Sequence, residues 1–320
     1  MTEPTDPPPD VFAALERCAR LAEDLRGFKR RPERLSAWLT AATLLSSDAE
    51  DQALVQRTDG IRTRLAAERG APSGSLRWIY AGVFASRDIP VERFLQTRQA
   101  LRDERRASKA ATMHAGGARA ALVLCAGGEI YPETIRRFFS MKQALQPPWW
   151  RRSASVTDTV AAAHVLKEDA EREVIAKRDR SRSVFEADKA LRRHKHDGAR
   201  LCALYDADPI EMRKRFMRLE GARRSSRALR RTVTKGALID WAAQGFEPDH
   251  LQTLERLMAE LPRLDAMAGA KAQLAHLIAI GGGSATSGIA AMSAVIAARA
   301  AMIATTIAAT STVTTTTATS

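Results

Sequence analysis

The chain has 320 residues, of which 45% are hydrophobic, 5% are aromatic and 27% are charged. So few aromatic side chains imply a core of Ala, Leu, Val and Ile, which suits close helix packing better than a β-sandwich. Segments that alternate apolar and polar residues are scarce, and we therefore predict an all-α fold. The formal net charge of +13 can influence which partners the protein attracts and how fast they associate, but it does not indicate a fold.

The first residues, 1–9, contain four prolines and no apolar run, so we expect a disordered leader there. They also lack the basic start and apolar stretch of a secretory signal, and we expect a cytoplasmic protein. Val11, Leu15 and Cys18 follow at helical spacing and predict an amphipathic helix that ends near Gly27.

A nine-residue segment occurs twice. Arg93–Leu101 reads RFLQTRQAL, and 44 positions later Arg137–Leu145 reads RFFSMKQAL, with five of nine positions identical. The two segments keep the same buried stripe, anchored by Phe94 and Phe138, and the same polar face. Internal repetition at this period indicates a stacked helical array.

Turn signals that combine acidic residues with Pro or Ala recur at steps of 38 to 42 residues. Each marks a helix start, because proline is tolerated in the first helical turn and acidic side chains complement the helix N-terminus. A short helix of small residues precedes each turn, and a charged helix follows it. The short helices are predicted at 35–45, 76–84, 118–126, 157–166, 198–205 and 236–243.

These features predict an α-solenoid-like array of about six antiparallel two-helix units, in which neighbours cover each other's apolar faces. We predict that the array forms a single domain over 10–309 and ends in a C-terminal capping helix. A Thr-rich tail over 310–320 is expected to be disordered.

The end of the chain carries a second apolar segment. Lys271–Ile280 predicts a further Ala/Leu helix, and a glycine-rich break follows it. Gly288–Ala309 is apolar and long enough to span a bilayer, with Arg299 as its single charge. Because a central arginine costs about 2.5–3.5 kcal/mol on insertion, we prefer the capping helix, and a membrane anchor is the alternative.

The sequence contains no Ser/His/Asp elbow, zinc-ligand spacing or phosphate loop. His194, His196 and Asp197 lie close together, but alternate spacing on a helix directs the two imidazoles apart. The three cysteines are isolated in Ala/Leu-rich patterns and are expected to be reduced core thiols. We therefore predict no catalytic residues, no metal and no cofactor, and we do not expect an enzyme.

One loop has an unusual composition, PPWWRR at 147–152. Trp149, Trp150, Arg151 and Arg152 are candidate interaction residues, because two indoles beside guanidinium groups can form a protein hot spot or a stacking platform. The structural alternative is a loop that fills the space between consecutive units.

Excess positive charge is concentrated between Glu171 and Lys235, where 20 basic residues stand against 10 acidic ones. The candidate nucleic-acid contacts are Arg213, Lys214, Arg223, Arg224, Arg227, Arg230 and Arg231. Phosphate contacts from this run would give sequence-independent, salt-sensitive binding. The alternative is a solvated, arginine-rich helix surface.

The chain resembles the uncharacterised bacterial family known as domain of unknown function 4003. The resemblance rests on the spaced helix pairs, on LRWIYAGVFASRDIPVERF at 76–94, and on Met302 in the closing AAMIA. It covers roughly Ser36 to Ala309. The family implies helical repeats but no activity and no catalytic residues.

Three functional hypotheses follow. The first is a non-catalytic protein-interaction scaffold with an unknown protein partner. The second is a basic helical-repeat protein that associates with nucleic acid through residues 213–231. The third is a membrane-associated protein anchored by Gly288–Ala309.

Overall fold

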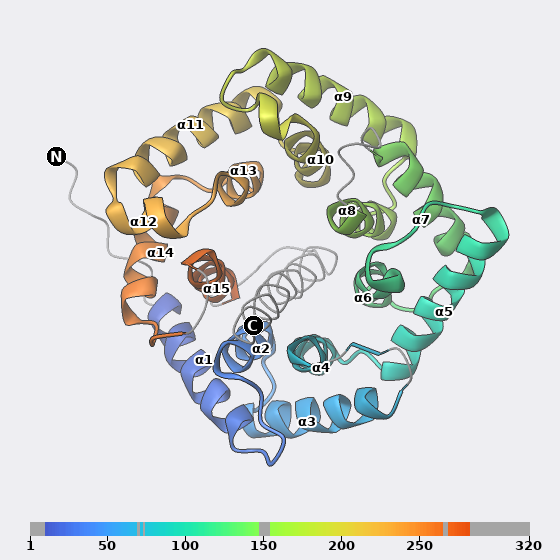
Figure 1. The fold of residues 1–320 in the computed structure, drawn as a ribbon, viewed down its shortest axis with the longest axis vertical. Coiled ribbons are helices and arrows are strands. Elements are labelled where there is room, and N and C mark those ends of the chain that lie inside the picture. The colour runs from blue at the N-terminus through green and yellow to red at the C-terminus, as the bar shows by residue number, and fades with distance from the viewer. Residues whose placement is uncertain (1–9, 69–70, 73, 147–153, 265–267, 282–320) are drawn as a thin grey trace, which may run out of the picture. The chain divides into compact units, whose positions relative to one another are not determined.

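The computed structural model describes residues 10–68, 71–72, 74–146, 154–264 and 268–281, and all regular structure within these ranges is helical (Figure 1). Short and long helices alternate along most of the chain. The all-α fold and its helical-repeat organisation are therefore confirmed.

The short helices match the predicted ones closely. They are α2 (Arg34–Leu44), α4 (Ser75–Arg87), α6 (Ala118–Cys125), α8 (Ala154–Leu166), α10 (Lys195–Tyr205) and α13 (Lys235–Ala243). The long helices that follow them are α3 (Asp51–Ala67), α5 (Val91–Ser108), α7 (Pro132–Leu145), α9 (Glu171–Ala187), α11 (Pro209–Ser225) and α14 (Pro248–Glu260). The others are α1 (Asp10–Arg26), α12 (Arg227–Thr232), α15 (Ala268–Gly281) and the 3-10 turns η1 (His114–Gly117) and η3 (Arg192–His194).

The start of α11 shows why the acidic turn signals locate the helices. Pro209 occupies the first turn, where its missing N–H removes no helical hydrogen bond. The Asp208 carboxylate accepts hydrogen bonds from the backbone N–H groups of Ile210 (2.9 Å) and Glu211 (3.0 Å). Two amide groups that the helix itself leaves without acceptors are thereby satisfied.

The described chain divides into two compact units. The first unit contains 10–92 and 253–281, and the second contains 93–252. In the second unit, the short helices α6, α8, α10 and α13 pack side by side in one layer, and the long helices α7, α9 and α11 form a layer against them (Figure 1).

The first unit joins segments that are far apart in the sequence. Helix α2 packs against α1 and α4, and α15 packs against both α1 and α2. A guanidinium N–H of Arg34 also donates to the carbonyl of Arg263 at 3.4 Å. The last described helix therefore covers the first ones.

Aromatic anchors of the repeat fill the core. Phe94, Phe138 and Phe216 are completely buried, and Leu101 and Leu145 of the repeated segment are buried with them. The predicted inward stripe of the long helices is therefore confirmed. It explains the recurrence of the segment, since α5 and α7 each bury one phenylalanine at the same place in the repeat.

Several predictions fall outside the described residues. These are the leader at 1–9, the loop at 147–153 with Trp149, Trp150, Arg151 and Arg152, the segment Gly288–Ala309 and the tail at 310–320. The single domain over 10–309 also stays a prediction. Among the described helices, none combines the length and apolar character needed to cross a bilayer.

Candidate nucleic-acid interface

The basic run from α11 through α12 has an uneven charge distribution. Between Glu220 and Ile239 the chain carries six basic residues and one acidic residue, a net charge of +5. The seven predicted contact residues all lie on α11 or α12, in the second compact unit. Their surroundings divide them into two groups.

The first group is paired with carboxylates. Arg213 forms an ion pair with Asp188 and thereby lowers the pKa of that carboxyl. Lys214 pairs with Glu211 one turn away, at 2.7 Å. These two cations are exposed, but each has an acidic neighbour that offsets its charge.

Glu220 binds two more of the predicted residues. This carboxylate is only 5% exposed. It accepts hydrogen bonds from Nε of Arg223 (2.7 Å) and Nε of Arg224 (3.0 Å). The hydrogen bond from Arg223 is the main cause of the lowered pKa of Glu220, because it favours the charged carboxylate.

Arg223 also reaches α12. Its Nη1 group donates to the carbonyls of Arg230 (3.4 Å) and Val233 (3.5 Å), at the C-terminal end of that helix. Arg223 therefore joins the buried Glu220 carboxylate to the end of α12, where carbonyls lack helical partners. These contacts hold α12 against α11.

Helix α12 is fixed from two sides. Leu229 of the helix and Val233, the residue that follows it, lie four residues apart, are 2% and 3% exposed, and belong to the core. The hydroxyl of Ser226 accepts a hydrogen bond from the N–H of Leu229 at 3.2 Å and caps the helix. A six-residue helix is thus held by buried side chains together with a local cap.

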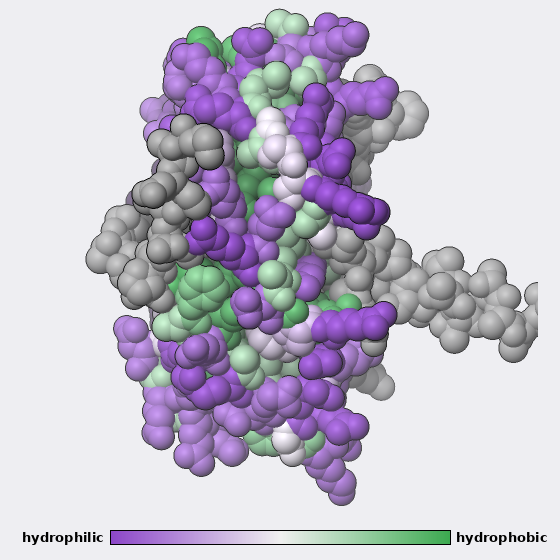
Figure 2. Space-filling model, turned by 90° about the vertical axis from the view of Figure 1, so that its left-hand side faces the viewer, coloured by the Kyte–Doolittle hydropathy of each residue, from purple (hydrophilic) through white to green (hydrophobic). Residues whose placement is uncertain are grey.

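The second group of predicted residues consists of Arg227, Arg230 and Arg231. All three side chains are exposed on α12, and with a spacing of three and four residues they share one face. None forms an ion pair with any residue that the structure describes. We call these three residues the α12 arginine face. Figure 2 shows the side of the molecule on which α12 lies, where hydrophilic side chains project from much of the surface.

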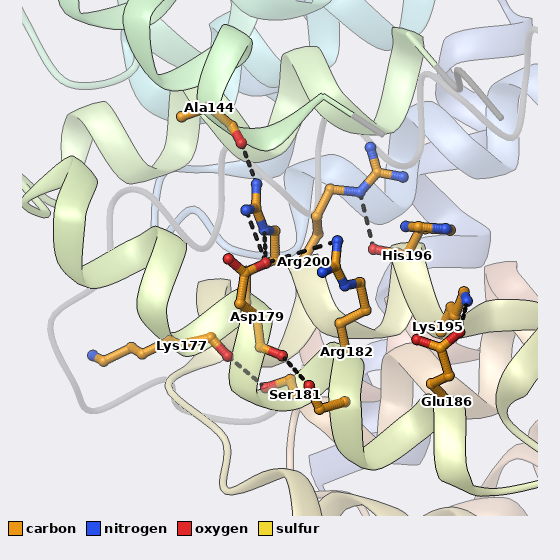
Figure 3. A network of polar contacts seen from close by, with 11 residues as sticks. Ala144, Lys177, Asp179, Ser181, Arg182, Glu186, Lys195, His196 and Arg200 are labelled. Atoms are coloured by element: carbon orange, nitrogen blue, oxygen red, sulfur yellow. Dashed lines mark hydrogen bonds and ion pairs between the residues drawn. The ribbon is translucent and has the colours of Figure 1, made fainter. Parts of the chain in front are cut away.

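Another basic cluster, between α7, α9 and α10, is used internally (Figure 3). Asp179 pairs with Arg178 (2.9 Å) and Arg182 (3.9 Å), and Arg178 also donates to the Ala144 carbonyl. Arg178 thus connects α9 to the end of α7, whereas the pair of Arg182 with Asp179 lies within α9. These contacts contribute to helix packing and leave little charge for a ligand.

Arg200 of the same cluster is 1% exposed. It pairs with Asp197, donates to the hydroxyl of Thr157, and donates to the His196 carbonyl at 3.2 Å. Burial lowers the pKa of this guanidinium, and Asp197 partly offsets that effect. Asp197 thus has a structural partner. Across the described residues, no group of three or more His, Cys, Asp or Glu could hold a metal ion.

The positions of the charges in the sequence do not distinguish the residues that pair with carboxylates from the α12 arginine face. The paired residues were partly detectable, since Glu220 lies three and four residues before Arg223 and Arg224, the spacing of helical ion pairs. The roles of Leu229, Val233 and Ser226 were missed, because the short α12 has too few residues to show a clear period.

Comparison of the chain with protein-family models, curated proteins and solved structures finds no match. The resemblance to domain of unknown function 4003 therefore stays a prediction.

Proposed function

We propose that this protein is a non-catalytic helical-repeat scaffold that binds nucleic acid through the phosphate backbone. The observation that carries the proposal is the α12 arginine face, formed by Arg227, Arg230 and Arg231. Three exposed guanidinium groups, which have no acidic partner among the described residues, share one face of a helix that buries Leu229 on its opposite face. Guanidinium groups suit this task, because their planar N–H donors match phosphate oxygens.

The chemistry of the face favours phosphates over bases. From Gly221 to Ile239 the chain contains no aromatic residue, so stacking on bases is not expected. Contacts to phosphates position a protein on nucleic acid but carry little sequence information. We therefore expect binding that depends on charge and is insensitive to sequence.

Fluorescence anisotropy with labelled duplex DNA and single-stranded RNA tests the proposal. Affinity should fall steeply as salt rises, and the variant R227A/R230A/R231A should bind more weakly. Each lost phosphate contact makes the slope of log K against log salt shallower by about 0.9 on duplex DNA. The slope of the triple variant should therefore be shallower than that of the wild type by about 3.

A matched variant separates this face from net charge. R136A/R137A/R172A removes three exposed arginines from α7 and α9 of the same compact unit. It should retain most of the wild-type affinity and slope. If the two triple variants bind equally, or if the wild type does not bind at about 50 mM salt, the proposal is wrong.

A protein-interaction role is the second candidate, and one observation favours it. Ile210 and Met217 on α11 are 48% and 50% exposed. They lie seven residues apart, and therefore on one helical face. Crosslinking in the native cell should recover a partner that I210S/M217S loses and that R136A/R137A retains. If both variants recover the same proteins, this face is not the docking surface.

We also propose a cytoplasmic location. Cys18, Cys125 and Cys202 are free and buried. Free thiols suit a reducing compartment, in which disulfides are rare. Microscopy of a tagged full chain, with fractionation as an independent readout, tests this assignment.

A further inference from the structure

A second basic site lies on α5, apart from α12. Arg102, Arg105 and Arg106 line an open cavity of about 400 Å³ together with Thr112, Met113 and Gly116. The cavity lies within the second compact unit, between the C-terminal half of α5 and the segment that leads into α6. Its volume is in the range of small-molecule sites, which is about 300–1,000 Å³.

The arginines of this cavity form a stripe along one face of α5. Arg98, Arg102 and Arg105 lie at helical spacing, and Arg106 is four residues from Arg102. Arg106 pairs with Asp103 at 3.6 Å. Arg102 and Arg105 are half-buried and form no ion pair within the described part of the chain. Like charges at this spacing repel one another, and a bound anion would relieve that repulsion.

The opposite wall of the cavity is a backbone segment held by hydrogen bonds from two other helices. The ammonium group of Lys142 donates to the Thr112 carbonyl at 2.8 Å, and the Asp158 carboxylate accepts from the His114 N–H at 2.7 Å. Lys142 and Asp158 form a buried ion pair with each other, with atoms 2.6 Å apart. A buried pair thus fixes both ends of the short segment 112–114.

The glycine in this wall allows a close approach. Gly116 has a φ of 60°, and a Cβ atom there would lie 3.2 Å from Nη2 of Arg102. The Gly116 carbonyl also accepts a hydrogen bond from Nε of Arg98 at 3.3 Å. Any side chain at this position would push against the arginine stripe and narrow the cavity.

We propose that this cavity binds a phosphate group, free or carried by a small molecule, through Arg102 and Arg105. Guanidinium groups hold phosphate oxygens in paired hydrogen bonds. The cavity has room for an attached organic group of nucleotide size, and Met113 offers an apolar wall to it. This site is independent of the α12 arginine face and does not rest on the proposed nucleic-acid binding.

Isothermal titration calorimetry on the full chain at about 50 mM salt tests the proposal. The titrants are inorganic phosphate, pyrophosphate and ADP, and uncharged adenosine is the control. We expect at least one of the phosphate compounds to bind and adenosine not to bind. If ADP binds more tightly than inorganic phosphate, the ligand of the cavity is a small organic phosphate. If the two affinities are equal, the ligand is the free phosphate ion.

Two pairs of variants locate the site. R102Q/R105Q should weaken binding about tenfold or more, whereas R136Q/R137Q removes the same charge from α7 and should change affinity less than about twofold. G116A should also weaken binding. G128A also places alanine at a positive φ, here 111°, but its Cβ atom meets nothing within 4 Å, and it should leave binding unchanged.

Three results would overturn the proposal. The first is no heat from any phosphate compound, and the second is equal affinity of R102Q/R105Q and wild type. The third is a short oligonucleotide that competes with ADP and loses affinity in R102Q/R105Q, which would make the cavity part of a nucleic-acid interface. R227A/R230A/R231A should bind ADP like wild type, so failure at one site is distinguishable from failure at the other.

Discussion

The Glu220 carboxylate accepts a 2.7 Å hydrogen bond from Nε of Arg223, and the same guanidinium donates to the carbonyl of Val233. An acidic side chain on α11 thus helps to position a helix that exposes three arginines, Arg227, Arg230 and Arg231. The pair also explains why only part of the arginine-rich run is available to a ligand.

Replacing Glu220 with Gln should destabilise the protein by about 1–3 kcal/mol, because two guanidinium groups would lose a nearly buried charged acceptor. The lowered pKa of Glu220 means that its contribution is present at neutral pH and is lost as pH falls through the folded-state pKa. Urea unfolding at pH 7 and under acid conditions measures both effects.

The control for that variant is Glu133→Gln. Glu133 and Arg136 form a solvent-exposed pair at 3.5 Å, and such pairs contribute little. Its free energy of unfolding should change by less than about 0.5 kcal/mol. Equal destabilisation by the two substitutions would mean that Glu220 acts as an ordinary surface charge.

Ser226→Ala should loosen α12 without removing a charge. The hydroxyl caps the N–H of Leu229, and loss of such a cap costs about 1 kcal/mol. We expect faster hydrogen exchange at the Leu229 amide and a few-fold weaker binding of nucleic acid. Ser225→Ala, next in sequence, removes a hydroxyl that bonds only the local Ala222 carbonyl among the described contacts. Unchanged exchange in S226A would show that tertiary contacts alone hold α12.

Gly82 on α4 is expected to be essential for packing against α2. A Cβ atom at this position would lie 2.5 Å from Oγ1 of Thr43 and 2.9 Å from Cγ2 of Thr40. G82A should therefore destabilise the protein by about 1–3 kcal/mol through overpacking. The measurement is the free energy of unfolding in urea.

Gly60 on α3 provides the matched comparison. A Cβ atom there meets nothing within 4 Å, and alanine is a better helix former than glycine. G60A should stabilise the protein by about 0.5–1 kcal/mol. G82A and G60A are expected to change the free energy of unfolding in opposite directions. Changes in the same direction would contradict the close contact of α2 with α4.

Stability should also depend on pH through His250. Its ring stacks on Phe246 at 4.0 Å between centroids and meets Trp241 edge-on at 5.7 Å. Burial lowers the pKa of His250 from 6.5 to about 4. The folded state therefore favours the neutral ring. The contribution of this ring to the free energy of unfolding is fully present above the unfolded-state pKa and is lost as pH falls toward 4.

Between pH 6.5 and 4 the unfolded state binds the extra proton, so the free energy of unfolding should fall by up to about 1.4 kcal/mol per pH unit. His250→Phe should flatten the profile in this window. Thermal unfolding of both proteins across the range measures the difference, and parallel profiles would exclude His250 as the cause.

Much of the fold was predictable from local patterns. The recurring acidic turns located the starts of the long helices, because proline and acidic side chains act at the first helical turn whatever the rest of the chain does. The buried stripe containing Phe94 and Phe138 was also predictable. Burial of one face of a helix imposes a 3.6-residue period that is visible in the sequence.

The site was predictable only in part. The basic run was evident, but which cations are available depends on pairs such as Arg213 with Asp188, 25 residues away. The cavity on α5 was not predicted, because its wall is fixed by Lys142 and Asp158, which other helices supply.

The sequence by itself determined that the chain forms repeated helix pairs with small residues on the short helices and one bulky anchor on the long ones. Only the tertiary structure decided that α15 covers α1 and α2 and that Arg227, Arg230 and Arg231 lack acidic partners in the described chain. The physical reason is range: helix periodicity and capping depend on neighbours within a few residues, whereas charge pairing and helix packing depend on distances in space.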